Sequence, residues 1–187
     1  MAAAAALHAC GGSNPDPTPE AAGPTSTASA PAATSTPVDD RAPTADDFVN
    51  LADMTPVRGF LVDNLAGDLD ATLAVARSAD GGTYPVGSVV QLVPTEAMVK
   101  RAPGFSPATN DWEFFVLDAT DQGTAIVTRG GAEVVNRFGG SCADCHSAAE
   151  ARFDLVCEQD HGCAPLPIGR PIIEALQDTD PRPRTDG

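Results

Sequence analysis

The sequence predicts an α+β domain, in which β-strands and a few short helices share one core behind a disordered N-terminal tether. Three observations lead to this prediction. Short runs of apolar, β-branched and aromatic residues alternate with turn residues, which is typical of strands. Segment 69–78 has Leu69, Leu73 and Ala76 at helical spacing. The residues before 46 are rich in Pro, Ser, Thr and Ala and include no aromatic residue, so they cannot offset the entropy of ordering.

Composition divides the chain of 187 residues into four parts, which are 1–10, 11–45, 46–180 and 181–187. The first part is apolar and ends at Cys10, like a bacterial lipoprotein signal with a lipidated cysteine, although His8 is unusual there and no basic residue precedes it. The alternative is an alanine-rich start with an incidental cysteine. The second part is a proline-rich linker that favours extended conformations, the third is the folded domain, and the last is a disordered polar tail.

The first half of the domain shows helix and strand signals in turn. A short helix is expected over 46–52 with Thr44 as its cap, and a first strand over 57–62. Asp68 is placed to cap the helix over 69–78, and Gly81 and Gly82 end it. A turn at 84–87 then leads into a strand over 88–93.

The second half begins with an extended segment at 97–100 and a loop at 101–110. The next strand, 112–117, carries aromatic residues on both faces, so we expect both faces to be buried. A turn at 121–123 makes 124–128 its hairpin partner, and residues 134–135 are expected to pair briefly. Two helices complete the prediction. One covers 147–157 with Ala149, Phe153 and Val156 on one face, and the last begins at Pro171 with Ile172, Ile173 and Leu176 turned inward.

The strongest motif is Cys142-Ala143-Asp144-Cys145-His146, which has the C-x-x-C-H spacing of a c-type haem attachment site. Two neighbouring thiols, of Cys142 and Cys145, would bond to the haem vinyl groups, and the imidazole of His146 would be the proximal iron ligand. Gly139, Gly140 and Ser141 supply an uncrowded backbone before the motif. The sequence therefore predicts one covalent haem c.

Two other interpretations use the same residues. A zinc site would draw four ligands from a larger set, Cys142, Cys145, His146, Cys157, His161 and Cys163. A thioredoxin-like redox pair would use the two motif cysteines but belongs in a different sequence context. In an oxidising compartment, Cys157 and Cys163 are expected to form a local disulfide, which would place His161 in an exposed loop.

From Tyr84 onward the chain resembles the cytochrome P460 and cytochrome c′-β superfamily over about half its length. The matching pieces are Tyr84-Pro85-Val86-Gly87-Ser88-Val89-Val90, Met98-Val99-Lys100, Gly104-Phe105, Asn110-Asp111-Trp112-Glu113-Phe114-Phe115 and the final C-x-x-C-H. The resemblance implies a compact α+β domain built on an antiparallel sheet, which agrees with the predicted strands. The family lysine that cross-links to the haem edge in P460 proper would fall at Leu92, so we expect an ordinary, uncross-linked haem c. Lys100, the single lysine of the chain, matches a different family lysine.

The sixth iron position separates an electron carrier from a ligand-binding protein. Met54 and Met98 are the internal methionines, and Met98 is expected to pack in the core. The resemblance implies a five-coordinate iron, open to NO, CO or peroxide, beneath an apolar distal wall. The aromatic candidates for that wall are Phe60, Phe105, Phe114 and Phe115. Arg129 or Arg137 are candidates to hold a haem propionate, with a solvated surface arginine as the alternative for each.

The formal net charge of −15 and the scattered arginines disfavour nucleic acid and favour a cationic redox partner or a small neutral ligand. No run of about twenty apolar residues is present, so membrane attachment is expected only through an N-terminal lipid, at the periplasmic or outer surface of a bacterial envelope. The first functional hypothesis is an extracytoplasmic monohaem cytochrome. The second is a haem enzyme acting on a small nitrogen species or peroxide, with Glu96, Asp111 and Glu113 as the acids near its site in sequence. The third is a zinc- or disulfide-stabilised surface interaction domain.

Overall fold

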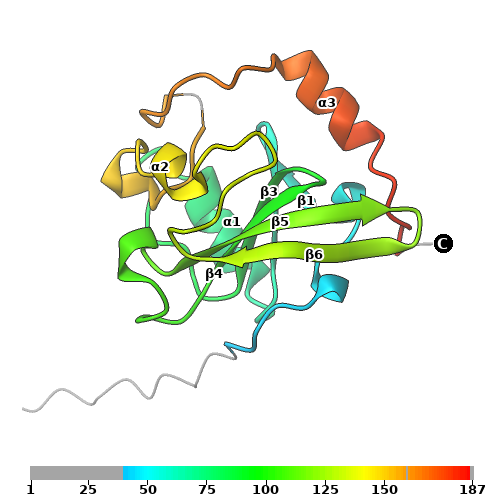
Figure 1. Cartoon of the computed structure of the whole chain (residues 1–187). Coiled ribbons are helices and arrows are strands. Elements are labelled where there is room, and N and C mark those ends of the chain that lie inside the picture. The colour runs from blue at the N-terminus through cyan, green and yellow to red at the C-terminus, as the bar shows by residue number, and fades with distance from the viewer. Residues whose placement is uncertain (1–39, 159, 186–187) are drawn as a thin grey trace, which may run out of the picture. The chain divides into compact units, whose positions relative to one another are not determined.

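A computed structural model describes residues 40–158 and 160–185, and within them the chain builds a six-stranded antiparallel sheet with three short α-helices (Figure 1). The strands follow one another in sequence order across the sheet, so each pairs with its neighbour in the chain. They are β1 (Thr55–Val57), β2 (Phe60–Asn64), β3 (Ser88–Val93), β4 (Glu96–Lys100), β5 (Trp112–Thr120) and β6 (Gly123–Gly130). The α-helices are α1 (Leu69–Arg77), α2 (Cys142–His146) and α3 (Arg170–Asp178). These elements confirm the predicted α+β class.

Both faces of the sheet are buried, because alternate side chains of each strand enter two separate apolar clusters. We call the face covered by α1 and α2 the helical face, and its main cluster is Val57, Phe60, Val62, Ala76, Tyr84, Val90, Met98, Trp112, Phe114, Val116, Val134, Ala143 and Val156. The opposite face carries Phe48, Leu51, Met54, Leu61, Val89, Ala97, Val99, Phe115 and Leu117. The first six residues of β5 are all buried, which confirms the expectation that both of its faces are covered.

The strands expected over 88–93 and 124–128 and the helix over 69–78 are confirmed in position. The single strand expected over 57–62 is wrong, because the chain turns at Arg58 and Gly59 and places Val57 opposite Phe60. Arg58 adopts a left-handed backbone with φ of 52°. The turn therefore divides one apolar run into β1 and β2.

The helix expected over 46–52 is also wrong. Two 3₁₀ turns, Ala45–Asp47 and Leu51–Asp53, replace it. Asp47 caps the first turn by accepting hydrogen bonds from the Thr44 backbone amide at 2.7 Å and the Thr44 hydroxyl at 2.9 Å. Hydrogen bonds from Arg41, together with these bonds from Thr44, lower the pKa of Asp47 to about 2.

After α2 the chain does not continue as the helix expected over 147–157. It forms a 3₁₀ turn at Ala151–Phe153, and Asp154 and Leu155 follow with left-handed φ values of 50° and 63°. Ala149, Phe153 and Val156 are nevertheless buried, as predicted. The reversal at 154–155 directs the Asp154 carboxylate to Lys100 instead of prolonging the helix.

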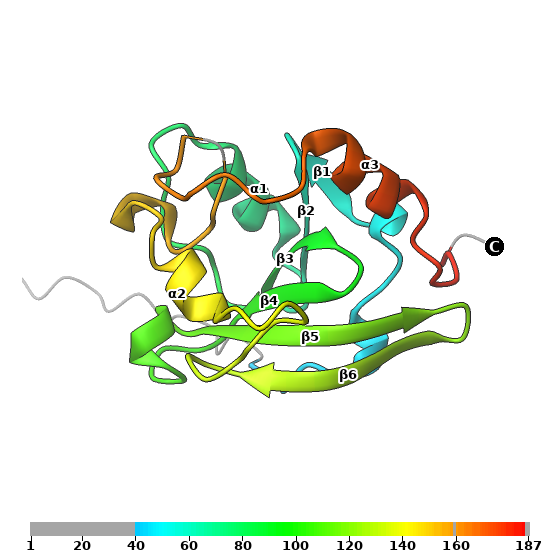
Figure 2. The ribbon, with the colours of Figure 1, turned by 45° about the horizontal axis from the view of Figure 1, so that its top comes forward.

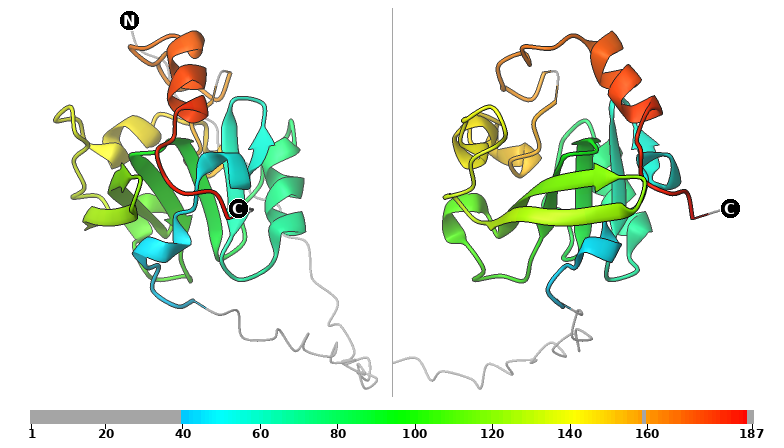
Figure 3. Two further views of the ribbon diagram at one scale, coloured as in Figure 1. Left: turned by 90° about the vertical axis from the view of Figure 1, so that its right-hand side faces the viewer. Right: turned by 45° about the vertical axis from the view of Figure 1, so that its right-hand side comes forward.

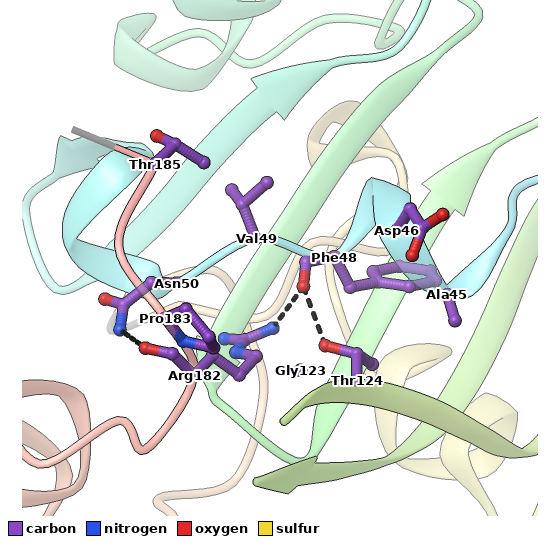
Figure 4. A pocket seen from close by; sticks show the side chains of 10 residues that line it. All are labelled: Ala45, Asp46, Phe48, Val49, Asn50, Gly123, Thr124, Arg182, Pro183 and Thr185. Atoms are coloured by element: carbon purple, nitrogen blue, oxygen red, sulfur yellow. Dashed lines mark hydrogen bonds between the residues drawn. The ribbon is translucent and has the colours of Figure 1, made fainter. Parts of the chain in front are cut away.

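The last helix forms, but the inward orientation expected for Ile172 and Leu176 is wrong, since they are 53% and 41% exposed. Beyond it, residues 181–185 pack against the N-terminal turns and are not the disordered tail expected there. Arg182 is buried, and its carbonyl accepts a hydrogen bond from the side-chain amide of Asn50 at 2.6 Å. Its guanidinium donates to the Phe48 carbonyl at 3.0 Å beside a cavity of about 180 Å³ (Figure 4).

Candidate functional site

The C-x-x-C-H residues form the short helix α2 at the edge of the helical face (Figure 1). The Ser141 hydroxyl oxygen caps the helix by accepting a hydrogen bond from the Asp144 amide at 3.1 Å. The Cys142 amide donates to the Val134 carbonyl at 3.0 Å, which confirms brief pairing near residues 134–135. Ala143 is buried in the helical-face cluster and fixes the orientation of the helix.

Both cysteines of the motif are free thiols, but their surroundings differ. Cys142 is half-buried against the helical-face cluster, whereas Cys145 is exposed. Burial, with smaller contributions from Glu96 and Cys145, raises the pKa of the Cys142 thiol to about 11. Both sulfurs are thus carried by one short helix.

The ring of His146 is oriented by a hydrogen bond to the backbone. Its Nδ1 lies 2.7 Å from the Leu155 carbonyl oxygen, and its ring centroid lies 5.1 Å from that of Phe114. A carbonyl oxygen only accepts, so this contact makes Nδ1 the protonated nitrogen and gives Nε2 the free lone pair. Desolvation lowers the pKa of His146 and favours the neutral imidazole. A neutral ring with an anchored N–H is the usual form of a metal-binding histidine.

A buried ion pair holds the Leu155 carbonyl in place. Lys100 Nζ donates to both carboxylate oxygens of the adjacent Asp154, at 2.7 and 2.9 Å, and both side chains are nearly inaccessible to solvent. The Tyr84 amide donates to the same carboxylate at 2.9 Å, and Trp112 Nε1 donates to the Asp154 carbonyl at 2.6 Å. Three residues from separate strands and turns, Tyr84, Lys100 and Trp112, therefore converge on the residue that precedes Leu155.

The zinc ligand set proposed from the sequence is not assembled. Cys157 and Cys163 form the predicted disulfide, which removes two thiolates from the set. The His161 ring stacks on Phe153 at a centroid distance of 3.5 Å, and its Nδ1 lies 2.8 Å from the Val156 carbonyl oxygen. Across residues 40–158 and 160–185, no three His, Cys, Asp or Glu side chains are grouped so as to hold a metal ion.

The four phenylalanines that are candidates for a distal wall do not share a surface. Phe60 and Phe114 lie on the helical face, and Phe114 lies beside the His146 ring. Phe115 is buried on the opposite face against Phe48. Phe105 is 40% exposed and lies under the Arg101 guanidinium. Since β5 directs its two neighbouring phenylalanines to opposite faces, Phe114 and Phe115 cannot belong to the same wall.

Among the candidate acids, Asp111 and Glu113 have structural partners. The Asp111 carboxylate accepts from the amides of Gly104 and Ser106, and Glu113 pairs with two arginines, Arg101 and Arg129. These contacts occupy both carboxylates and the Arg129 side chain.

Glu96 is different, because it is half-buried on β4 and influences the Cys142 thiol electrostatically. Desolvation raises its pKa, and Arg137 partly offsets the increase. Arg137 itself donates to Asp118 at 3.2 Å and to the Leu117 carbonyl.

Of the methionines in the described part of the chain, Met98 lies in the helical-face cluster and Met54 on the opposite face. Leu92 packs against the helical-face cluster together with Cys142, on the same side of the sheet as α2. Cys10 and His8 lie outside the described residues, as do the signal of 1–10 and most of the linker of 11–45. Within the described residues, no helix has the length and apolar character needed to cross a membrane.

Comparisons of this chain with known protein families, with curated proteins and with solved structures found no match.

Proposed function

We propose that this chain is an extracytoplasmic monohaem c-type cytochrome, similar to the cytochrome P460 and c′-β superfamily, that transfers electrons or binds a small ligand such as NO at a five-coordinate iron. The observation that supports this most strongly is the state of α2. The two cysteines of α2 are free thiols, whereas Cys157 and Cys163 form a disulfide. The Nδ1 of His146 is hydrogen-bonded to the Leu155 carbonyl, which leaves the lone pair of Nε2 available to a metal. This donor set fits a haem c better than zinc or a redox disulfide.

The residues of the chain have separate tasks in this proposal. Cys142 and Cys145 would carry the thioethers, and His146 would bind the iron from the proximal side with its ring fixed by the Leu155 carbonyl. When bound, the haem supplies one-electron redox chemistry and an open coordination position. Phe114, beside the His146 ring, would shield the proximal side from water.

A five-coordinate iron is supported by the contacts of the side chains that could act as a sixth ligand, because each of them is engaged elsewhere in the described structure. Met98 is the described methionine on the helical face, and it is buried in the apolar cluster. Lys100 is occupied by Asp154 and by the Asn110 carbonyl at 2.6 Å, and His161 is stacked on Phe153. Leu92 stands where P460 proper has its cross-linking lysine, which favours an ordinary haem c over a hydroxylamine oxidase.

The second candidate function is a haem enzyme that oxidises or detoxifies a small nitrogen species or peroxide. Glu96 is the observation that favours it, since a half-buried carboxyl group with a raised pKa beside Cys142 could exchange protons near the haem edge. Either function would take place outside the cytoplasm, where a lipid on Cys10 would attach the protein to a membrane. The negative net charge of the chain would favour a cationic redox partner in both cases.

The full chain, produced in a host with haem-maturation machinery, tests the proposal. We expect a mass increase of one haem and a reduced α-band typical of haem c, and we expect NO and CO to change the spectrum. The Cys142→Ser/Cys145→Ser variant should lose the haem, while the matched Cys157→Ser/Cys163→Ser variant should keep it. A colourless protein that binds zinc would instead support the third hypothesis, a zinc-stabilised surface interaction domain. A strongly red-shifted Soret band on reduction would favour the enzyme.

A further inference from the structure

The segment that carries the disulfide returns to the motif helix. The Sγ of Cys157 lies 3.6 Å from the Cys145 carbonyl oxygen and 3.9 Å from the His146 carbonyl oxygen. Figures 1 and 2 show the chain passing beside α2 after the motif before it continues to α3, and Figure 3 shows the same arrangement from two other directions. A disulfide sulfur therefore contacts the residue that carries the exposed thiol of the motif.

The free thiol of Cys145 is placed to reach the Cys157 sulfur. Because a cysteine sulfur lies no more than about 5 Å from its own carbonyl oxygen, the two sulfurs are at most about 9 Å apart. Cys145 is exposed, so its side chain can change rotamer without displacing core residues. Cys142 is half-buried against the helical-face cluster and lacks this freedom. Cys145 is thus the motif thiol that is positioned to attack the disulfide.

Cys157 is the sulfur that would be attacked, and Cys163 is the one that would leave. A negative charge on Cys157 would lie beside two carbonyl oxygens, whereas residues 164–167, which follow Cys163, are exposed, so water can solvate a thiolate there. The better stabilised thiolate is the better leaving group. The backbone after Cys157 is held in place meanwhile, because the Glu150 amide donates to the His161 carbonyl at 2.7 Å.

A bond between Cys145 and Cys157 would cost little additional chain entropy. These two residues are 12 positions apart, against the 6 that separate Cys157 from Cys163. Doubling the length of a loop lowers the probability of closing it only about threefold. The exchange also needs no oxidant, because one disulfide breaks for each one that forms.

We propose that the Cys157–Cys163 disulfide and the Cys145 thiol form a reversible exchange centre in the haem-free chain. Cys145 loses its proton to solvent and attacks the Cys157 sulfur, the Cys157–Cys163 bond breaks, and Cys163 leaves with the bonding electron pair and takes up a proton. The product has a Cys145–Cys157 disulfide and free thiols at Cys142 and Cys163. The exchange is a redox-sensitive switch, since it withdraws one of the two motif thiols without net oxidation. It goes beyond the proposed function and holds whether or not the motif thiols later carry a haem.

The first test maps disulfides in the full chain produced without haem-maturation machinery. The protein is incubated at pH 8 without added thiol, quenched with N-ethylmaleimide and digested without reduction, and linked peptides are quantified by mass spectrometry. We expect the Cys145–Cys157 linkage in at least about 1% of the molecules, at every protein concentration. Maleimide labelling of Cys163 should fall at least about tenfold in Cys145→Ser and stay unchanged in the matched control Cys142→Ser. A smaller linked fraction, equal labelling of Cys163 in the two variants, or a linkage that grows with protein concentration would overturn the proposal.

The second test measures the reach of each motif thiol in two variants that share the Cys163→Ser change. Cys142→Ser/Cys163→Ser keeps Cys145 and Cys157, and Cys145→Ser/Cys163→Ser keeps Cys142 and Cys157. With oxidised glutathione, the first variant should form its internal disulfide at least about tenfold faster than the second, and equal rates would overturn the proposal. Haem content by mass is measured separately on matured protein. A matured protein without haem would refute the proposed function, and a missing Cys145–Cys157 linkage would refute this inference alone.

Discussion

Neutralising Asp154 is expected to destabilise the fold more than any other single charge change around the site. Its carboxylate lies 2.7 Å from Lys100 Nζ, with side chains only 6% and 7% exposed, and it also accepts a hydrogen bond from the Tyr84 amide. The Asp154→Asn substitution preserves the size of the side chain and tolerates the left-handed backbone at this position. It therefore isolates the effect of the charge.

The expected loss in the free energy of unfolding is about 3–5 kcal/mol, the usual result of leaving one charge of a buried pair uncompensated. Among the described residues, the Asn110 carbonyl is the other acceptor bonded to Lys100, and it can offset only a small part of this loss. With a urea dependence of about 2 kcal/mol per molar, the unfolding midpoint should fall by about 2 M.

Urea unfolding of the haem-free protein measures this loss. The matched control is Asp70→Ala, an exposed carboxylate in the first turn of α1, which should change stability by less than about 0.5 kcal/mol. The double variant Lys100→Met/Asp154→Asn should be more stable than Asp154→Asn alone, because it leaves no unpaired charge buried. A loss below about 1 kcal/mol for Asp154→Asn, or a double variant no more stable than the single one, would refute the reasoning.

Three further outcomes are expected. In the haem-free protein at pH 8, iodoacetamide should label the half-buried Cys142 far more slowly than the exposed Cys145. The reason is that a pKa of about 11 leaves Cys142 with roughly a hundredfold less thiolate than an ordinary thiol. Peptide mass mapping measures the labelling of each cysteine, and equal labelling would contradict the prediction. Replacing Cys157 and Cys163 by Ser should lower the free energy of unfolding by about 2 kcal/mol, because the bond closes a short loop, and an unchanged thermal midpoint would disprove it. Desolvation lowers the pKa of His146 in the folded protein, so the unfolded chain binds the proton more readily. The haem-free protein should therefore lose stability as the pH falls below about 6.5, the ordinary pKa of histidine. The urea midpoints at pH 7.5 and 5.5 should differ less in His146→Gln than in the parent protein, and an equal difference would count against this prediction.

The strands could be predicted because burial on both faces leaves continuous apolar runs, as in 112–117. The same continuity concealed the turn at Arg58, since a left-handed arginine next to a glycine gives a weak turn signal. In the segment after α2, the helical spacing of Ala149, Phe153 and Val156 predicted which residues are buried but not their conformation. The chain buries them through a 3₁₀ turn and two left-handed residues, and the same reversal brings the Asp154 carboxylate to Lys100.

The spacing of Cys142, Cys145 and His146 predicted a local constellation, and a single helix carries it. What supports that constellation could not be predicted. The acceptor for His146 is a backbone carbonyl, which any residue at position 155 would supply, so it leaves no trace in the sequence. The single lysine of the chain is conspicuous in the sequence, but its buried aspartate partner lies 54 positions away and nothing in the local sequence connects the two.

These supports give the site a physical property that its motif alone does not have. Lys100 fixes Asp154, the backbone passes directly to Leu155, and the Leu155 carbonyl fixes the tautomer and the orientation of the His146 ring before any ligand is bound. An imidazole that is already oriented loses little conformational freedom when it binds iron, so more of the binding free energy remains for affinity. If the proposed haem is bound, Asp154→Asn should perturb its iron ligation as well as stability, although Asp154 itself would not bind the haem. A haem-loaded variant that loses stability but keeps an unaltered spectrum would show that the ring is held by Phe114 and the proposed thioethers instead.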